Sequence, residues 1–250
     1  MWSGSLVSGS LVFTRPPEKV VVMEYIFEGI KQGFLLLFPP KKEIIEIVFL
    51  SIVVSGTATV LSGAFAIPMG IFLAVKEFRF KRFLTAILNT SLVFPAVLIG
   101  LLVYIFLSRR GPLGAFGLLF TPYAIIIAQA ILATPIIATL VLSALKGIAK
   151  DVQDVSYSLG ANKYQMALVL IKEGKFAFLT AVIAGFSRVI GETGMTLMVG
   201  GNIKGTTRVM TTTIALETMK GNFEIGIAVG IVLLFVAIVI NIILQVIQGK

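Results

Sequence analysis

One apolar stretch of this chain, Phe176 to Gly200, contains two opposite charges, Arg188 and Glu192. Residues four apart share one face of a helix, so these side chains are predicted to pair. A charge inside an apolar segment usually faces the protein interior or a water-filled path. Gly191, Thr193 and Gly194 flank the acid, and the two glycines favour loosening of the helix there. Two interpretations remain open: a structural ion pair that fixes helix packing, or a hinge or gate beside a translocation path.

A second polar stretch follows, from Gly200 to Asn222. It is rich in glycine, threonine and asparagine and contains an arginine, so it offers many hydrogen-bond donors. Such donors suit a tetrahedral oxyanion. The alternative is an ordinary external loop whose threonines and asparagines cap helices. The residues predicted to line the mouth of an anion path are Asn202, Thr207, Arg208 and Thr211.

The composition argues against catalysis in this chain. Cysteine and histidine are both absent, which removes thiol chemistry, the commonest metal ligand and the commonest general base. The phosphate-binding pattern Gly-x-x-x-x-Gly-Lys-Ser/Thr does not occur either. We therefore predict no enzyme activity, no metal site and no bound cofactor. Any ATP that drives this protein must bind a separate subunit.

The same composition indicates an integral membrane protein. Of the 250 residues, 57% are hydrophobic and 13% are charged, against about 25% charged in soluble domains. The formal net charge is +9, and the basic residues lie between apolar segments. Anionic lipid headgroups are therefore better partners for them than a nucleic acid.

Five apolar segments are long enough to span a bilayer. We predict an all-α polytopic protein with spans at about 47–75, 83–108 (interrupted at Pro95), 123–145, 176–200 and 225–247. The segment from Met23 to Phe38 is amphipathic but too short to span, so it is predicted to be an interfacial helix. Residues 1–22 are expected to be a tail, with Met23 as a plausible alternative start, and 23–250 a single transmembrane domain.

The interval 146–175 is the longest polar connection between spans. Apolar residues recur at helical spacing on both sides of Gly160, which predicts an amphipathic helix, a glycine turn and a second amphipathic helix. A simple crossing between two spans needs neither this length nor two apolar faces. The interval is therefore predicted to contact a partner, although a surface-lying hairpin without a partner is the alternative.

This interval resembles the EAA loop of ABC-transporter permeases. Asp154-Val155-Ser156 stands in the place of Glu-Ala-Ala, the core Leu159-Gly160-Ala161 is kept, and Leu170-Ile171-Lys172-Glu173 departs from the usual closing Ile-x-Leu-Pro. In that family the loop is the coupling helix that fits a cleft on a cytoplasmic ATPase. The residues that the resemblance assigns to ATPase coupling are Asp154, Ser156, Leu159, Gly160, Ala161 and Lys163.

Within these permeases the chain is similar to the oxyanion branch, and to its tungstate uptake permeases in particular. The similarity rests on three stretches: Gly191-Glu192-Thr193-Gly194, Gly200-Gly201-Asn202-Ile203, and Thr207-Arg208 through Leu216-Glu217-Thr218. It implies a type I ABC importer permease fold and transport of tungstate, with molybdate as the alternative anion. The partners it implies are a second copy of the chain, two ATP-binding cassette subunits and an extracytoplasmic binding protein.

A gradient-driven secondary transporter or channel for a small anion is the rival hypothesis. Such a protein usually has paired halves with broken helices and mid-membrane acids in both, and no second half is recognisable here. A scaffold or assembly factor is a third option, but it does not need charges inside a span.

The distribution of basic residues predicts the orientation. Segments 76–82, 146–175 and 248–250 hold ten Lys or Arg in 40 residues, whereas 1–46, 109–110 and 201–224 hold ten in 72. The denser set is expected in the cytoplasm. The prediction is a multi-pass protein of the cell membrane, with its N-terminus outside and its C-terminus inside.

Overall fold

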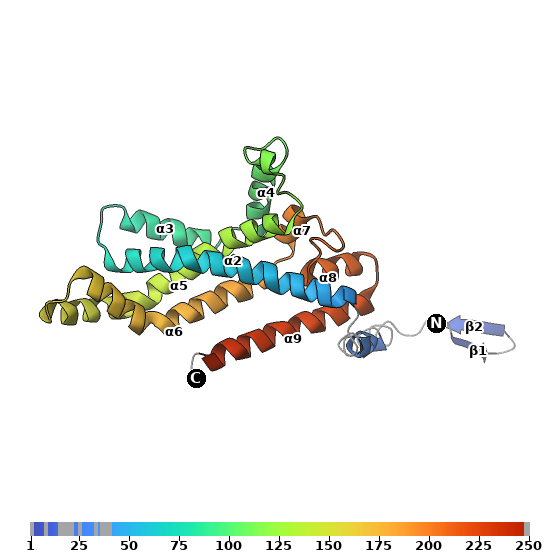
Figure 1. Cartoon of the computed structure of the whole chain (residues 1–250). Coiled ribbons are helices and arrows are strands. Elements are labelled where there is room, and N and C mark those ends of the chain that lie inside the picture. Colours follow the sequence, from blue (N-terminus) through green and yellow to red (C-terminus); the bar gives the residue numbers. More distant parts are fainter. Residues whose placement is uncertain are drawn as a thin grey trace.

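The computed structural model describes residues 3–7, 10–14, 23–24, 27–32, 35 and 42–247. Four long helices lie side by side (Figure 1): α2 (Lys42–Val75), α5 (Pro122–Ser158), α6 (Lys163–Ile190) and α9 (Phe223–Ile247). The shorter helices are α3 (Lys81–Ser91), α4 (Ala96–Leu107), the 3₁₀ turn η1 (Gly114–Phe116), α7 (Gly194–Gly200) and α8 (Met210–Met219). The described part of 23–250 is thus all-helical, as predicted.

The first residues form a small element that the sequence did not predict. Strands β1 (Ser3–Val7) and β2 (Ser10–Thr14) pair antiparallel, with Ser3 opposite Thr14 and Val7 opposite Ser10. In the expected interfacial helix, residues 27–32 are helical. The remainder of that segment, apart from residues 23–24 and 35, lies outside the described residues, so its interfacial position stays a prediction.

Three helices of the described chain are long and apolar enough to cross a membrane. They are Lys42–Val75, Pro122–Ile148 and Phe223–Ile243, and they correspond to the expected first, third and last spans. The expected second span is bent: α3 and α4 meet at 101°, and α4 stands away from the long helices in Figure 1. Pro95 lacks an N–H and disfavours helical backbone at Phe94, so the helix ends and starts again in a new direction.

The expected fourth span, Phe176–Gly200, is also not one helix. It comprises the last half of α6 and all of α7, with a break between Ile190 and Gly194. The predicted helix, glycine turn and second helix in 146–175 are present, but neither helix is separate from the adjoining span. The first is the end of α5, which runs on to Ser158, and the second is the start of α6. No residue between Lys146 and Ser158 breaks a helix strongly, so the polar composition marks the end of the apolar segment rather than the end of the helix.

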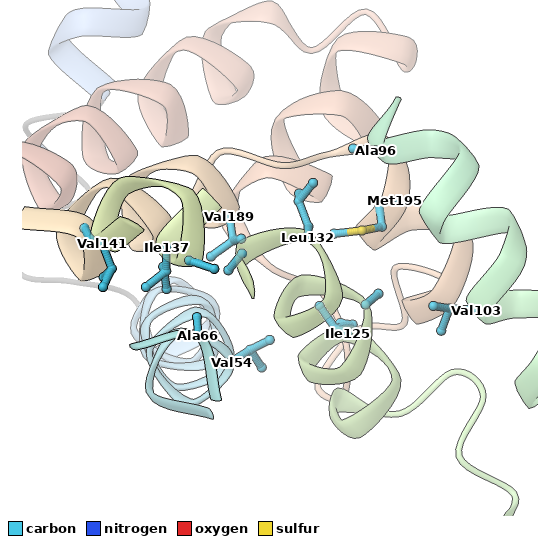
Figure 2. Close-up of a cluster of buried hydrophobic side chains, with 14 of the residues drawn as sticks. Val54, Ala66, Ala96, Val103, Ile125, Leu132, Ile137, Val141, Val189 and Met195 are labelled. Atoms are coloured by element: carbon cyan, nitrogen blue, oxygen red, sulfur yellow. The ribbon is translucent and has the colours of Figure 1, made fainter. Parts of the chain in front are cut away.

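The hydrophobic core lies where α2, α5, α6 and α7 meet. Ala66 of α2 lies near Ile137 of α5, Val54 lies on the side of Ile125, and Met195 of α7 points towards Leu132 (Figure 2). Close approach of the helices depends on small residues: a Cβ on Gly70 would lie 2.7 Å from Val141 Cγ1. Within this core Ser62 Oγ donates a 3.0 Å hydrogen bond to the Ala130 carbonyl, which joins α2 to α5.

Candidate functional site

The turn between α5 and α6 is the first candidate site. Gly160 has φ +71°, in the left-handed region, and a Cβ there would meet no atom within 4 Å. Backbone conformation rather than space therefore explains the glycine. The Ala161 amide donates to the Ser156 carbonyl at 2.8 Å, and Asn162 caps α6 by accepting a 2.9 Å bond from the Gln165 amide. These bonds fix a tight helical hairpin.

The hairpin presents apolar side chains to its surroundings. Val155 is 59% exposed, Leu159 80% and Tyr164 72%. Asp154 is exposed beside them, whereas Ser156 is buried and Ala161 is half-buried. We call Asp154, Val155, Leu159, Gly160 and Tyr164 the tip surface. An exposed apolar group bounded by polar residues indicates a contact with another protein or a membrane.

The break between α6 and α7 is the second candidate site. Arg188 Nη1 donates to Glu192 Oε2 at 2.7 Å, so the predicted pair forms. The side chain of Arg188 is 45% exposed and that of Glu192 is 12% exposed. In this single chain the pair therefore borders on open surface rather than packing within the core.

The backbone around Glu192 is held from two further elements. Its carbonyl accepts hydrogen bonds from Thr196 Oγ1 of α7 at 2.9 Å and from Thr211 Oγ1 of α8 at 3.2 Å. A Cβ on Gly194 would lie 3.0 Å from Val97 of α4, whereas one on Gly191 would meet nothing within 4 Å. Thr193 is the residue before α7 and its side chain makes no capping bond. Gly194 thus serves close packing, while the surroundings do not require a glycine at 191.

Sequence analysis missed two amides that support this break. Gln129 of α5 is buried, and its Nε2 donates to the Val189 carbonyl at 3.1 Å. Ser187 of α6 donates to Asn241 Oδ1 of α9 at 3.4 Å. The sequence did contain a signal for both residues, because each is a strongly polar amide within an uncharged apolar segment. In a membrane protein such a side chain needs a hydrogen-bond partner on another helix.

The segment between α7 and α8 contains the third candidate site, which the structure shows in detail. Thr207 is fully buried, and its hydroxyl donates its one hydrogen to the Gly200 carbonyl at 2.5 Å and accepts from the Ile203 amide at 2.9 Å. Thr211 is also buried and bonded to Glu192. Neither hydroxyl is available to an anion in this conformation. The two threonines, predicted to line an anion path, here hold the segment in shape.

Asn202 and Arg208 retain free hydrogen-bonding atoms. Asn202 has φ +50°, and its Nδ2 donates to the Thr212 carbonyl at 3.3 Å, while its Oδ1 is buried without a partner among the described residues. Arg208 Nη2 donates to the Asn202 carbonyl at 3.4 Å, and Arg208 Nε is likewise buried with no partner in the described part of the chain. Of the four predicted residues in this segment, Arg208 is the one with unused donors near an open cavity.

Glu217, near the end of α8, accepts hydrogen bonds from the turn that follows this helix. It is largely buried and accepts bonds from Asn222 Nδ2 at 2.7 Å and from Lys220 Nζ at 2.9 Å. The Asn222 and Lys220 hydrogen bonds lower the pKa of the Glu217 carboxyl, although burial opposes them. At its other end α8 is joined to α2, because the Met210 amide donates to Ser51 Oγ at 2.9 Å.

The chain is thus a bundle of apolar helices with a polar break and a protruding helical hairpin. Residues 66–250 match the family of binding-protein-dependent transport system inner membrane components, and the chain belongs to this family. It is a multi-pass membrane protein, and its relatives are transport permeases.

Two relatives and one solved structure show which transport permeases this chain is similar to. The chain is 42% identical to the tungstate uptake system permease protein TupB of Peptoclostridium acidaminophilum, over 91% of this chain and 100% of that protein. It is 40% identical to TupB of Campylobacter jejuni, over 89% of this chain and 93% of that protein. The fold is similar to that of a chain of the inward-facing MetNI methionine ABC transporter, with a TM-score of 0.70 and 19% identity over 84% of this chain and 97% of that chain.

Proposed function

We propose that this chain is the transmembrane subunit of an ATP-driven importer for an oxyanion, with tungstate as the substrate and molybdate as the alternative. The observation that carries the coupling part of this proposal is the tip surface, where Leu159 is 80% exposed at the end of the α5–α6 hairpin. The names of the relatives at 40–42% identity support the anion.

The tip surface is the proposed ATPase contact. Leu159 enters an apolar cleft of the ATPase, and Asp154 pairs with a basic residue beside that cleft. Gly160 gives the turn its left-handed backbone, and Ser156, Ala161 and Lys163 belong to the same hairpin. Because α5 and α6 continue from the tip into the bundle without a break, a movement of the tip is transmitted directly to the helices.

The α6–α7 break is the proposed gate. A charge pair that is partly exposed on one chain, in a segment otherwise apolar, is costly next to lipid. A second copy of the chain covers this face and encloses the path between the two subunits. An extracytoplasmic protein delivers the anion to this homodimer, and two ATPase subunits bind from the cytoplasm. ATP bound to the ATPase subunits supplies the energy, and this chain itself holds no cofactor.

The orientation follows from the same assignment. The tip must face the cytoplasm to meet an ATPase, so α8 and the start of α2, which lie at the opposite end of the long helices (Figure 1), face outside. With this placement the C-terminus is cytoplasmic and the N-terminus outside.

Reconstituted transport tests the proposal. The tagged chain, purified with the ATPase that accompanies it, is placed in liposomes together with its binding protein, and tungstate uptake is measured with and without ATP. We expect uptake that requires ATP and the ATPase. Uptake by the chain alone, driven by an ion gradient, would establish the rival secondary transporter instead.

A further inference from the structure

A cavity of about 470 Å³ lies between the start of α2 and the segment that joins α7 to α8. Lys42, Glu43 and Glu46 line it from α2, and Lys204, Thr206 and Arg208 line it from the connecting segment. A second cavity of about 280 Å³ lies on the other side of the same residues, because Glu43 and Arg208 line both. These two side chains therefore stand between the two cavities.

The charges around the larger cavity do not balance. Lys204 Nζ pairs with Glu43 Oε2 at 2.9 Å, and Lys42 Nζ pairs with Glu46 Oε1 at 3.9 Å. Arg208 makes no ion pair within 4.0 Å among residues 42–247. Within the described part of the chain Arg208 therefore lacks a direct ion-pair partner, although its charge interacts at longer range with the Glu217 carboxylate, which lines the smaller cavity with it.

The guanidinium of Arg208 also has unused hydrogen-bond donors. A guanidinium carries five N–H donors, and among the described residues this one makes a single side-chain hydrogen bond, of 3.4 Å to the Asn202 carbonyl. Its Nε is buried and has no hydrogen-bond partner in the same part of the chain. A buried charged donor without an acceptor is costly, and a planar guanidinium is well matched to two oxygens of a tetrahedral anion.

We propose that Arg208 and Lys204 form an oxyanion-binding site in this cavity, for which the Glu43 carboxylate competes. Glu43 neutralises Lys204 when the site is empty. An entering dianion binds Arg208 and draws Lys204 away from Glu43, and repulsion from Glu43 keeps the affinity low enough for release. The site rests on the proposed function, because it is where an anion first meets the permease on the side opposite the tip surface.

Substitutions of Arg208 and Glu43 are predicted to change the affinity for the anion in opposite directions. Truncation of Arg208 removes attraction, whereas neutralisation of Glu43 removes a competitor, so the two substitutions must change affinity in opposite directions. If both residues only stabilised the fold, the two substitutions would not change the affinity in opposite directions. Arg110 provides the matched control, because it is an exposed arginine in the turn after α4 with no side-chain partner within the described part of the chain.

The experiment measures tungstate binding to the tagged full chain, in nanodiscs with whatever subunits purify with it, by equilibrium dialysis without ATP. Arg208→Gln should weaken binding about 10-fold, the loss of one charge-assisted contact, and Arg208→Lys should weaken it less. Glu43→Gln should tighten binding about 3-fold, and Arg110→Gln should leave it unchanged. Sulfate should compete with tungstate, and chloride should compete far less.

Three results would overturn the inference: no tungstate binding by the wild type, equal binding by Arg208→Gln, or weaker binding by Glu43→Gln. Equal competition by chloride would also overturn it, because the site would then recognise charge rather than an oxyanion. ATP-dependent uptake without this binding pattern refutes the Arg208 site alone. Uptake that ignores ATP refutes the proposed function, whatever binding at Arg208 shows.

Discussion

The two ends of the helical bundle use their residues in opposite ways. At the α5–α6 end, apolar side chains such as Leu159 and Tyr164 are exposed, and backbone bonds of the turn account for its shape. At the end with α7 and α8, polar side chains such as Thr207, Thr211 and Glu217 are buried and bonded within the chain. The first end leaves apolar side chains exposed, where we propose a contact with another protein, whereas the second end buries its polar side chains and bonds them within the chain.

The largest expected effect is at the tip surface. Leu159→Asp places a charge where we propose an apolar contact, so tungstate uptake should fall at least about 10-fold through loss of ATPase binding. The apparent melting temperature should not change, because Leu159 is exposed. Transport assays and thermal unfolding of the same preparations measure both. Phe116→Asp, at another exposed apolar residue, is the control and should retain the ATPase.

Gly160→Val should uncouple transport. A β-branched residue at φ +71° costs about 1–2 kcal/mol and shifts the turn. We expect ATP hydrolysis to continue while uptake drops, and both rates can be measured in the same liposomes. Gly147→Val is the matched control, since Gly147 lies within α5 and also has open space around it. Normal uptake by Gly160→Val would contradict the assigned role of the turn.

Thr207→Val tests the end of the bundle that contains α7 and α8. The change leaves the Gly200 carbonyl and the Ile203 amide without their partner, which should destabilise the protein by about 1–3 kcal/mol. Thermal unfolding in detergent measures the loss. The neighbouring Thr206→Val should be nearly neutral because Thr206 is exposed. Equal melting temperatures for the two variants would refute the framework role of Thr207.

The smallest effect concerns Glu217 and pH. Because its folded-state pKa is lowered, its ionised form stabilises the fold above the unfolded-state pKa of about 4.3, and this contribution is lost as pH falls through the lower folded-state value. Glu217→Gln should therefore be less stable than the wild type at neutral pH, with a difference that shrinks below about pH 4. Melting curves across pH measure it, with exposed Glu173→Gln as control. A difference that stays constant with pH would count against an ionised Glu217.

Helix content and the main apolar spans could be predicted because length and composition determine them. Pro95 predicted an interruption, but its local effect on backbone angles does not specify the 101° bend that packing of α4 on α7 selects. Likewise, the change to polar residues after Leu145 was mistaken for the end of a helix. A helix continues past the membrane when nothing in its sequence stops it, as α5 does to Ser158.

Within the candidate sites, local spacing was informative and long-range partners were not. The Arg188–Glu192 pair joins residues four apart across the end of α6, and it could be predicted from spacing alone. The buried bond of Gln129 to Val189 joins residues 60 apart, and the ion pair of Lys204 with Glu43 joins residues 161 apart. Such partners depend on which helices pack together, which a single sequence does not specify.

Co-purification tests the central claim most directly. The tagged chain is extracted in mild detergent, and the ATPase retained by the wild type, Asp154→Lys and Glu173→Lys is quantified. Both carboxylates are exposed, but only Asp154 belongs to the tip surface. Our account predicts that the wild type and Glu173→Lys retain the ATPase and that Asp154→Lys releases it. Absence of an ATPase from the wild type, or equal retention by both variants, would contradict the coupling role of the α5–α6 hairpin.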